Sequence, residues 1–473
     1  MRRIPRRSFL ESCAAAGTAF GASPFLKGWV PMTKQRHVVV VGAGAFGGWT
    51  ALHLLRRGAR VTLVDAWGPG NSRASSGGET RVIRGTYGPR GIYTHLTARA
   101  LQLWKEHERR WHLKLYHPIG VLWLVESDEA YEKAALPLLK EAGLAFEELS
   151  GAETARRYPQ INCERVRWSI FEKDGGYLTA RRACAAVLEG FLAEGGEYRQ
   201  LAVEPSARLG AGELRGIKLS DDSTVAADAF VFACGPWLGQ LFPDVIGERV
   251  RATRQEVFFF GTPPGDVRFT EQALPVWADH GRGFIYGIPG NEWRGFKVAD
   301  DTRGPPFDPT TGERLPTPEA LKAAREYLAF RFPGLKGAPL VEARVCQYEN
   351  SPDEHFIMDR HPAATNVWLV GGGSGHGFKH GPAVGELVAK LVLGGEVAPP
   401  EFRLSRFEAG ARPGGQSTRL CVRSSSGTSI GSSGSCRATS RHMCAKRMRS
   451  ISPPAIWAQS FRIPSARARA SCR

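Results

Sequence analysis

The sequence predicts an α/β fold that opens with a dinucleotide-binding unit. A β-branched run from His37 to Val41 predicts a buried parallel strand. It leads directly into the glycine-rich segment Gly42-Ala43-Gly44-Ala45-Phe46-Gly47, and a second predicted strand, Arg60 to Val64, ends at Asp65. Because 473 residues are too many for one simple core, two intertwined domains are expected.

Each part of this opening unit has a physical reason. Gly42 allows a tight turn, Gly44 lets the backbone approach a pyrophosphate, and Gly47 lets helix and strand pack closely. Residues Thr50 to Arg57 are expected to form the helix, whose N-terminus offers N–H groups to phosphates, and Asp65 is expected to accept hydrogen bonds from a ribose. The alternative is a glycine-rich turn in an unrelated α/β protein, and the pattern alone does not separate NAD from FAD.

Positive charge is concentrated at the two ends of the chain. The formal net charge is +17, of which residues 1–36 contribute +6 and residues 411–473 contribute +12. The body, residues 37–410, therefore carries a net charge of −1. A basic pI that belongs to the ends is poor support for nucleic-acid binding by the folded part, and no nucleic-acid partner is expected.

The N-terminus has the pattern of an export signal. The segment Arg6-Arg7-Ser8-Phe9-Leu10 matches a twin-arginine signal, and the apolar stretch from Cys13 to Phe25 is too short to span a bilayer. Residues 1–35 are therefore expected to be a twin-arginine signal peptide, which places the protein in the periplasm or outside the cell, without stable membrane insertion. The alternative is a basic, disordered N-terminus on a cytoplasmic protein.

The C-terminal segment, residues 411–473, differs in composition from the rest. It is rich in Ser, Arg, Gly and Ala and contains no Asp or Glu, so it cannot bury enough apolar surface to order itself. One interpretation is a basic tail that contacts nucleic acid or anionic lipid. We favour the other, a frameshifted, non-native coding sequence.

The cysteines of the body do not form a recognisable framework. They are scattered along the chain without CxxC spacing, at Cys163, Cys184, Cys234 and Cys346. This pattern predicts neither a disulfide scaffold nor a zinc site, and no metal is expected.

Four further segments follow the glycine-rich opening in a fixed order. They are Ser75-Ser76-Gly77-Gly78-Glu79-Thr80-Arg81-Val82-Ile83-Arg84, then Val231-Phe232-Ala233-Cys234-Gly235-Pro236-Trp237, then Arg344-Val345-Cys346-Gln347-Tyr348 with Asp353-Glu354-His355-Phe356-Ile357, and last Gly371-Gly372-Gly373-Ser374-Gly375-His376-Gly377-Phe378-Lys379. In this order they resemble the monomeric sarcosine oxidase family, which includes N-methyltryptophan and pipecolate oxidases within the D-amino-acid-oxidase-like flavoproteins. The resemblance covers roughly residues 37–408 and implies FAD rather than NAD.

The resemblance also implies the domain organisation. A Rossmann-like FAD-binding domain is expected from residues 36–117, 177–250 and 340–410, and an inserted, sheet-rich substrate domain from residues 118–176 and 251–339. Consistent with this, Phe284-Ile285-Tyr286 and Gly295-Phe296-Lys297-Val298 look like two strands around a turn. A monomer is expected.

Cys346 matches the position at which this family bonds FAD covalently through a thioether. The reaction needs a thiolate, which a nearby cation stabilises, and Arg344 is a possible helper because residues two apart in a strand share a face. The alternative is an inert buried cysteine. The remaining cofactor contacts that we expect are Gly42, Gly44, Gly47, Asp65, Thr80, Arg81 and Gly375.

The resemblance assigns catalytic roles to three residues. Lys297, eleven residues after Tyr286, matches the family's catalytic lysine near flavin N5, where a cation promotes the reaction with oxygen. Tyr286 matches the accompanying tyrosine, and His376 is expected beside the flavin. The alternatives are a surface lysine and a histidine with only a structural role.

Three further residues are expected to bind the substrate. Arg84 and Lys379 match the pair that holds its carboxylate, with ordinary salt bridges as the alternative. Asp301 stands where the family usually has a histidine that contacts substrate, and Glu349 replaces a common threonine. These two departures leave the exact substrate open.

The expected activity is oxidation of the C–N bond of a secondary or N-methylated amino acid, with FAD as cofactor and O2 as electron acceptor. The product imine is hydrolysed and hydrogen peroxide is released. Two alternatives stay open at this point. One is a flavin-dependent dehydrogenase that passes electrons to a quinone or carrier protein, and the other is a non-catalytic flavin-binding protein.

Overall fold

A computed structural model describes residues 35–407 of the chain, apart from residues 128, 205–211 and 282. The described residues belong to one compact unit, Met1–Arg412. Residues 1–34 of the expected signal peptide and the basic tail at 411–473 lie outside the described residues. Among the helices of the described part, none is long and apolar enough to cross a membrane.

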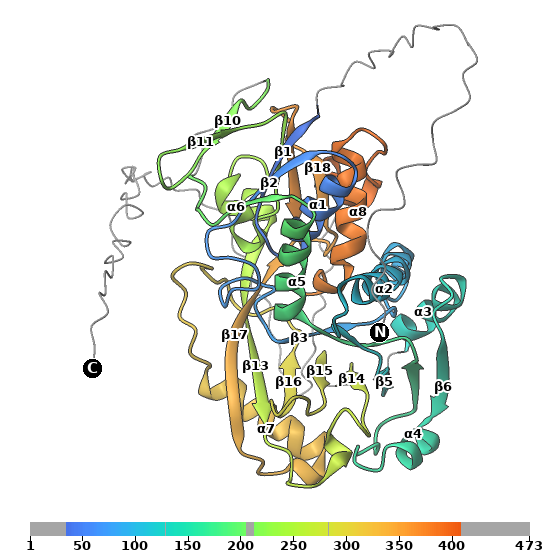
Figure 1. Ribbon diagram of the computed structural model, residues 1–473. Helices are drawn as coiled ribbons and strands as arrows, with labels where there is room; N and C mark the ends of the chain where they lie inside the picture. The colour runs from blue at the N-terminus through green and yellow to red at the C-terminus, as the bar shows by residue number, and fades with distance from the viewer. Residues whose placement is uncertain (1–34, 128, 205–211, 282, 408–473) are drawn as a thin grey trace, which may run out of the picture. The chain divides into compact units, whose positions relative to one another are not determined.

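The nucleotide-binding half is built on a six-stranded sheet with the order β18-β19-β12-β1-β2-β9 (Figure 1). Its strands are β1 (His37–Val41), β2 (Arg60–Val64), β9 (Glu197–Arg199), β12 (Ala229–Phe232), β18 (Ile357–Arg360) and β19 (Val367–Gly371). All neighbouring pairs are parallel except β18 with β19. The two strands expected from the sequence, His37 to Val41 and Arg60 to Val64, are confirmed with the same bounds.

Both faces of this sheet are covered, as the continuous apolar runs predict. Val38 and Val40 face a core shared with the helices, whereas Val39 and Val41 face a second core on the other side. The helices of the first core are α1 (Ala45–Arg56), α2 (Gly91–Trp111), α5 (Ala180–Ala193) and α8 (Gly381–Val392). The hairpin β10 (Gly216–Lys218) and β11 (Thr224–Ala226) and the short α6 (Leu238–Leu241) cover the second core.

The first helix begins five residues earlier than expected from the sequence. The prediction placed its start at Thr50, but α1 begins at Ala45 and includes Gly47 and Gly48. Glycine has a low helix propensity, which is why this turn was not expected to be helical. Here tertiary packing prevails, because a Cβ on Gly47 would lie 1.8 Å from the carbonyl oxygen of Gly42.

The other half contains an eight-stranded sheet with the order β17-β13-β16-β15-β14-β5-β7-β6. Its strands are β5 (Val121–Val125), β6 (Phe146–Ser150), β7 (Trp168–Glu172), β13 (Arg251–Phe260), β14 (Val276–Asp279), β15 (Ile285–Ile288), β16 (Phe296–Asp300) and β17 (Leu340–Asn350). The strands β13 and β17 pair antiparallel along almost their whole length and run side by side in Figure 1. The expected strand pair around residues 284–298 is confirmed as β15 and β16.

The two faces of the eight-stranded sheet differ. Helix α7 (Pro318–Arg331) packs on one face, where Phe296 and Val298 of β16 point into an apolar core. Because side chains alternate along a strand, Lys297, Ala299 and then Asp301 belong to the opposite face. The register places Tyr286 opposite Ala299, so Tyr286 lies on that face as well. Helices α3 (Ala130–Glu141) and α4 (Gly151–Arg157) complete this half.

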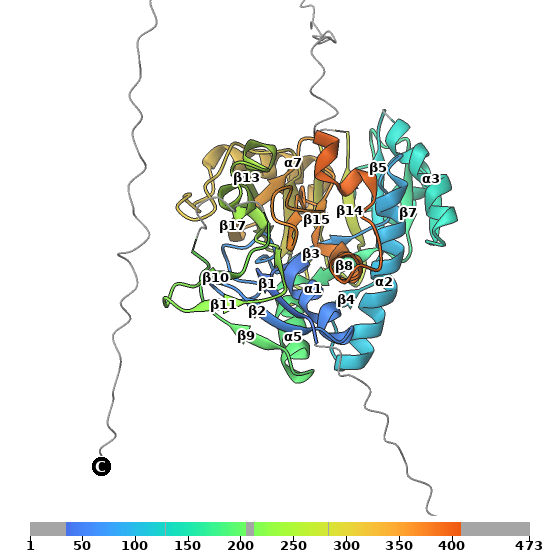
Figure 2. The ribbon, with the colours of Figure 1, turned by 90° about the horizontal axis from the view of Figure 1, so that it is seen from above.

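A small sheet lies between the two large ones. It has the order β3-β8-β4 and consists of β3 (Thr80–Ile83), β8 (Gly176–Thr179) and β4 (Tyr116–His117). Figures 1 and 2 both show β3 between the two halves, close to β15. Since β3 carries Arg81 and Arg84 directly follows it, the motif from Ser75 to Arg84 lies at the junction where a cofactor and a substrate would meet.

Candidate active site

The glycine turn after β1 has the shape that a dinucleotide requires. Gly42 adopts φ +103°, and a Cβ there would lie 2.3 Å from the carbonyl oxygen of Ala233. By contrast, a Cβ on Gly44 would meet only Ser76 Oγ, at 3.5 Å. Gly42 therefore packs directly against the backbone at Ala233, where no side chain would fit. The protein leaves the space next to Gly44 open, as expected for the approach of a pyrophosphate.

The N-terminus of α1 is free to bind an anion. Its N-cap, Gly44, provides no side-chain cap, and the first turn contains no acidic residue. The first N–H groups of a helix have no partner within the helix, and the helix dipole adds positive potential at the same end. Together with the open space at Gly44, this end of α1 fits the pyrophosphate of FAD.

Asp65 has a structural role that the sequence did not reveal. One carboxylate oxygen accepts a hydrogen bond from the N–H of Ala43 at 2.7 Å, and the other accepts from Trp67 at 2.9 Å and Gly68 at 2.7 Å. Burial raises its pKa above the usual value. Asp65 therefore ties the glycine turn to the end of β2. A carboxylate has about four acceptor sites, so the expected ribose contact stays a prediction.

Cys346 lies beside an arginine, but not the one that strand alternation favoured. Its sulfur is 3.5 Å from Arg81 Nη2. Arg344 instead forms ion pairs with Glu79, at 3.0 Å, and with Glu342. Of the two arginines, the one next to the sulfur is therefore Arg81, which comes from β3 and is far away in the sequence.

Lys297 is buried, so the alternative of a surface lysine is wrong. Its side chain is 2% exposed, and its ammonium donates a hydrogen bond to the carbonyl oxygen of Thr80 at 3.2 Å. The nitrogen lies 5.3 Å from the ring centre of Tyr286, as in a cation–π contact. Burial, together with the positive charge of Arg81, lowers the pKa of Lys297 to about 7.

Arg84 is enclosed by aromatic rings. The guanidinium carbon lies 4.5 Å from the ring centre of Tyr87, 5.0 Å from Trp123 and 6.0 Å from Phe284. It donates a hydrogen bond to the carbonyl oxygen of Thr86. Within the described part of the chain, no carboxylate forms an ion pair with it, so the alternative of an ordinary salt bridge is wrong for Arg84.

Lys379 is buried near Arg84. It also lacks an acidic partner among the residues that the structure describes. Its side chain is 4% exposed and donates hydrogen bonds to Tyr87 Oη at 2.7 Å and to the carbonyl oxygen of His376 at 2.8 Å. Burial, together with the charge of Arg84, holds the pKa of Lys379 well below its usual range. A bound carboxylate would reverse this effect, because an opposite charge favours the charged form.

His376 is held in one tautomer by its hydrogen bonds. Its Nε2 is 3.1 Å from the carbonyl oxygen of Glu354, which can only accept, so Nε2 carries the hydrogen. Its Nδ1 lies 3.2 Å from Tyr87 Oη, and the same hydroxyl is 2.8 Å from His380 Nε2. Burial and the neighbouring Lys379 hold the pKa of His376 well below its usual range, so the ring is neutral.

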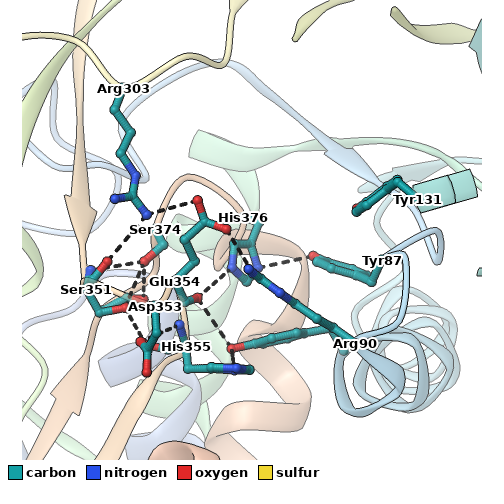
Figure 3. Close-up of polar contacts among 12 residues, drawn as sticks. Tyr87, Arg90, Tyr131, Arg303, Ser351, Asp353, Glu354, His355, Ser374 and His376 are labelled. Atoms are coloured by element: carbon teal, nitrogen blue, oxygen red, sulfur yellow. Dashed lines mark hydrogen bonds and ion pairs between the residues drawn. The ribbon is translucent and has the colours of Figure 1, made fainter. Parts of the chain in front are cut away.

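The loop that carries Glu354 braces this histidine (Figure 3). Glu354 adopts φ +65°, an uncommon conformation for a residue other than glycine. Its two carboxylate oxygens each lie 2.9 Å from an arginine, one from Arg90 and one from Arg303. The strained backbone is thus fixed from both sides, and its carbonyl oxygen stays directed at His376.

Asp301 contacts a tyrosine rather than a base. Tyr348 Oη donates a hydrogen bond to Asp301 Oδ1 at 2.5 Å, and Tyr348 is itself close to Tyr286. Burial raises the pKa of Asp301, although Tyr348, Arg84 and Lys379 oppose this. The structure therefore brings together all three expected substrate-binding residues, which come from separate segments.

Three residues of the site were missed or left without a role at the sequence level. Tyr87 joins Lys379 to two histidines, but no motif marks it. Tyr348 follows Cys346 by two residues and shares its face of β17, a signal that could have been used. Glu349, 6% exposed, keeps Oε1 without a hydrogen-bond partner, and burial raises its pKa to about 7.

Comparison with known proteins is consistent with this geometry. Residues 37–391 match the family described as DAO, FAD dependent oxidoreductase. The chain is 31% identical to monomeric sarcosine oxidase of Arthrobacter sp. (strain TE1826), covering 77% of this chain and 94% of that protein. It is 30% identical to human peroxisomal sarcosine oxidase, covering 78% and 95%. It is 29% identical to N-methyl-L-tryptophan oxidase of Salmonella agona (strain SL483), covering 78% and 98%.

Solved structures share the fold at lower identity. The L-proline dehydrogenase of P. horikoshii superposes with a TM-score of 0.69 at 21% identity, covering 80% of this chain and 98% of that one. From the sequence matches we conclude that the chain is an FAD-dependent oxidoreductase that belongs to the DAO family, within the group that contains monomeric sarcosine oxidase and N-methyl-L-tryptophan oxidase.

Proposed function

We propose that the protein is an oxidase of a small secondary or N-methylated amino acid. The observation that carries the proposal is the pair Arg84, which is partly buried, and Lys379, which is buried. Neither basic group has an acidic partner within the described residues. A substrate carboxylate would supply the missing anion. The relatives named as sarcosine and N-methyl-L-tryptophan oxidases support the same substrate class.

The residues of the site have separate tasks in this reaction. Arg84 and Lys379 bind the carboxylate. Tyr87 accepts a hydrogen bond from Lys379 and donates one to His376, and so fixes their geometry. When bound, FAD would supply the two-electron redox chemistry between the C–N bond and oxygen. Lys297 holds a positive charge where oxygen becomes negative. In sum, the amine, O2 and water yield a carbonyl compound, the released amine and H2O2.

A substrate screen with the FAD-loaded protein tests the proposal. N-methyl amino acids and cyclic imino acids are added without oxygen, and loss of the flavin absorbance is followed. In air, the same compounds should give H2O2 in equal amount to the substrate consumed. Bleaching without peroxide, but with reduction of a quinone or dye, would indicate a dehydrogenase. No bleaching by any member of either class would leave a non-catalytic flavin-binding protein.

We further propose that FAD is bound covalently through Cys346. The support is the position of the sulfur, 3.5 Å from Arg81, since cations stabilise the reactive thiolate. After acid precipitation, the flavin should stay with the protein pellet. The Cys346→Ser variant should release it. A colourless pellet from fully loaded wild-type protein would contradict the proposal.

Export through the twin-arginine route is also proposed, on the sequence at Arg6 and Arg7 alone. This route carries folded proteins, which suits a chain that must bind its cofactor before export. Replacing both arginines by lysine should keep the protein in the cytoplasm, whereas the unchanged chain should appear in the periplasmic fraction. A monomer is expected, and light scattering of the purified protein measures this.

A further inference from the structure

The charges around the substrate position do not pair with one another. Arg84 and Lys379 have no carboxylate within ion-pair distance, and Asp301 has no basic group within that distance, among the residues that the structure describes. All three are nevertheless close enough to influence one another electrostatically. Lys379 is buried and the other two are partly buried, and charges withdrawn from water without partners are costly. The arrangement therefore suits a ligand that brings both signs of charge.

Asp301 keeps one oxygen available. Its Oδ1 accepts the hydrogen bond from Tyr348 Oη at 2.5 Å, whereas Oδ2 has no partner within the described part of the protein. Lys297, the nearest lysine along the strand, donates to the carbonyl oxygen of Thr80 instead. Tyr348 therefore orients the carboxylate without neutralising it.

We propose that Asp301 binds the ammonium group of the amino-acid substrate and accepts its proton. The inference rests on the proposed function and extends it, because it states that the substrate enters as the zwitterion. One N–H bond of the ammonium breaks, an O–H bond forms at Asp301, and the electron pair remains on nitrogen. The neutral amine is then the species that is oxidised.

The surroundings of Asp301 suit a proton acceptor. A base works best when its pKa is close to the working pH, and burial shifts the pKa of Asp301 in that direction. The charged and titratable groups around it come from several elements: Arg84, Lys379, Tyr348, Tyr286, Asp300 and Lys297. Of these, Tyr348 already donates to Asp301, and the basic groups lie beyond ion-pair distance.

A pair of ligands of equal shape tests the binding step. N,N-dimethylglycine carries an ammonium group, and 3-methylbutanoate has a C–H in its place. Their dissociation constants are measured by calorimetry on the FAD-loaded enzyme without oxygen. The wild type should bind dimethylglycine at least about tenfold more tightly, which is the effect of one charge-assisted hydrogen bond.

The Asp301→Asn variant should remove this preference, so that the two ligands bind with similar constants. Asp300→Asn is the matched control, because Asp300 is the adjacent, exposed aspartate that accepts a hydrogen bond from the Thr302 N–H. It should leave the ratio unchanged. Equal binding of both ligands by the wild type, or an unchanged ratio in Asp301→Asn, would overturn the inference while leaving an amino-acid site in place. Failure of both ligands to bind would count against the proposed function itself.

The proton step has a separate readout. In anaerobic single-turnover experiments, the rate of amine oxidation should fall on the acidic side of neutrality in the wild type. Without the carboxylate, only substrate that is already neutral reacts. The oxidation rate of Asp301→Asn should therefore keep rising with pH until the pKa of the free amine is reached. At pH 7 the loss should be about a hundredfold, in the range for removal of a general base. An identical pH profile in both proteins would show that Asp301 does not accept the proton.

Discussion

The glycine turn after β1 and the charged cluster around Asp301 belong to the same candidate active site, but they are built in different ways. The turn consists of consecutive residues, and its shape is fixed by backbone contacts such as that between Gly47 and Gly42. The cluster takes Arg84, Lys379 and Asp301 from distant segments and holds them through side chains. At Gly42 and Gly47 of the turn a methyl group would collide with the backbone, whereas in the cluster the charge of each group matters.

The glycine turn is suited to recognise the cofactor, and the charged cluster is suited to select the substrate. A pyrophosphate needs backbone N–H groups and space, which glycine provides in any member of the fold. A substrate is distinguished by the charges and shapes of side chains. We therefore expect substitutions in the turn to affect folding and FAD content, and substitutions in the cluster to affect substrate binding at normal FAD content.

The largest effect should come from Gly47→Ala. The new methyl carbon would lie 1.8 Å from the carbonyl oxygen of Gly42, a contact that requires the backbone to move. We expect little folded protein and no bound FAD, measured by circular dichroism and by the ratio of flavin to protein absorbance.

Gly44→Ala is the informative counterpart. Its methyl group would meet only Ser76 Oγ, at 3.5 Å, so the chain should fold normally and yet lose most of its FAD. Normal FAD content in Gly44→Ala would place the pyrophosphate elsewhere. Unfolding of Gly44→Ala to the same extent as Gly47→Ala would show that the two glycines have the same structural role.

In the cluster, Arg84→Gln should have the next largest effect. It removes one of two basic groups that face the carboxylate, and breaking a buried ion pair costs about 4 kcal/mol, or roughly a thousandfold in kcat/KM. FAD content should stay normal. The control is Arg157→Gln, because Arg157 is exposed and pairs with Glu147, where about 1 kcal/mol or less is expected. Equal losses in both variants would refute a specific role for Arg84.

Lys297→Met should act on the oxygen reaction alone. Loss of one strong electrostatic stabiliser costs about 3 kcal/mol, so reaction with oxygen should slow about a hundredfold, while anaerobic reaction with the amine changes far less. Because burial lowers the pKa of Lys297 to about 7, the wild type should lose its ammonium charge, and hence rate with oxygen, as the pH rises above 7. The methionine variant should lack that decline. Stopped-flow absorbance follows both reactions, and equal slowing of the two would assign Lys297 to positioning.

The same contrast explains which features could be predicted from the sequence. The strands at 37–41 and 60–64 and the turn between them follow from local patterns, and the structure has them with the predicted bounds. The start of α1 was placed too late because Gly47 and Gly48 pack against other parts of the chain, which local propensity does not include. Tertiary contacts overrule propensity at such positions.

The candidate site was predicted only where family motifs name its residues. Cys346 lies beside Arg81 and not beside Arg344 because of the way β3 packs near β17. That packing cannot be predicted from the sequence alone. Tyr87 is the clearest case, because its hydroxyl joins Lys379 to His376 and His380 without belonging to any motif. Such contacts arise when separate segments come together, so only the folded chain reveals them.

Substitution of Glu349 should change activity least. It tests the contact between the substrate half, which contains β17, and the nucleotide-binding half. It lies on β17, three residues after Cys346. A Cβ on Gly371, at the end of β19 in the nucleotide-binding sheet, would nevertheless lie 2.3 Å from its Oε1. Burial raises its pKa to about 7, with the N–H groups of Gly372 and Gly373 acting in the opposite direction.

The pH dependence follows from the sign of this shift. In the unfolded chain Glu349 has its ordinary pKa of about 4.5, so between about pH 4.5 and pH 7 the folded protein binds more protons than the unfolded chain. The free energy of unfolding therefore decreases as the pH rises from about 4.5 to 7, by at most about 3 kcal/mol. Glu349→Gln keeps the shape and removes the titration. Its unfolding temperature should therefore exceed that of the wild type by a few degrees at pH 8 and approach it at pH 5, measured by calorimetry on the FAD-loaded protein. A constant difference between the two proteins across this range would mean that Glu349 does not titrate there.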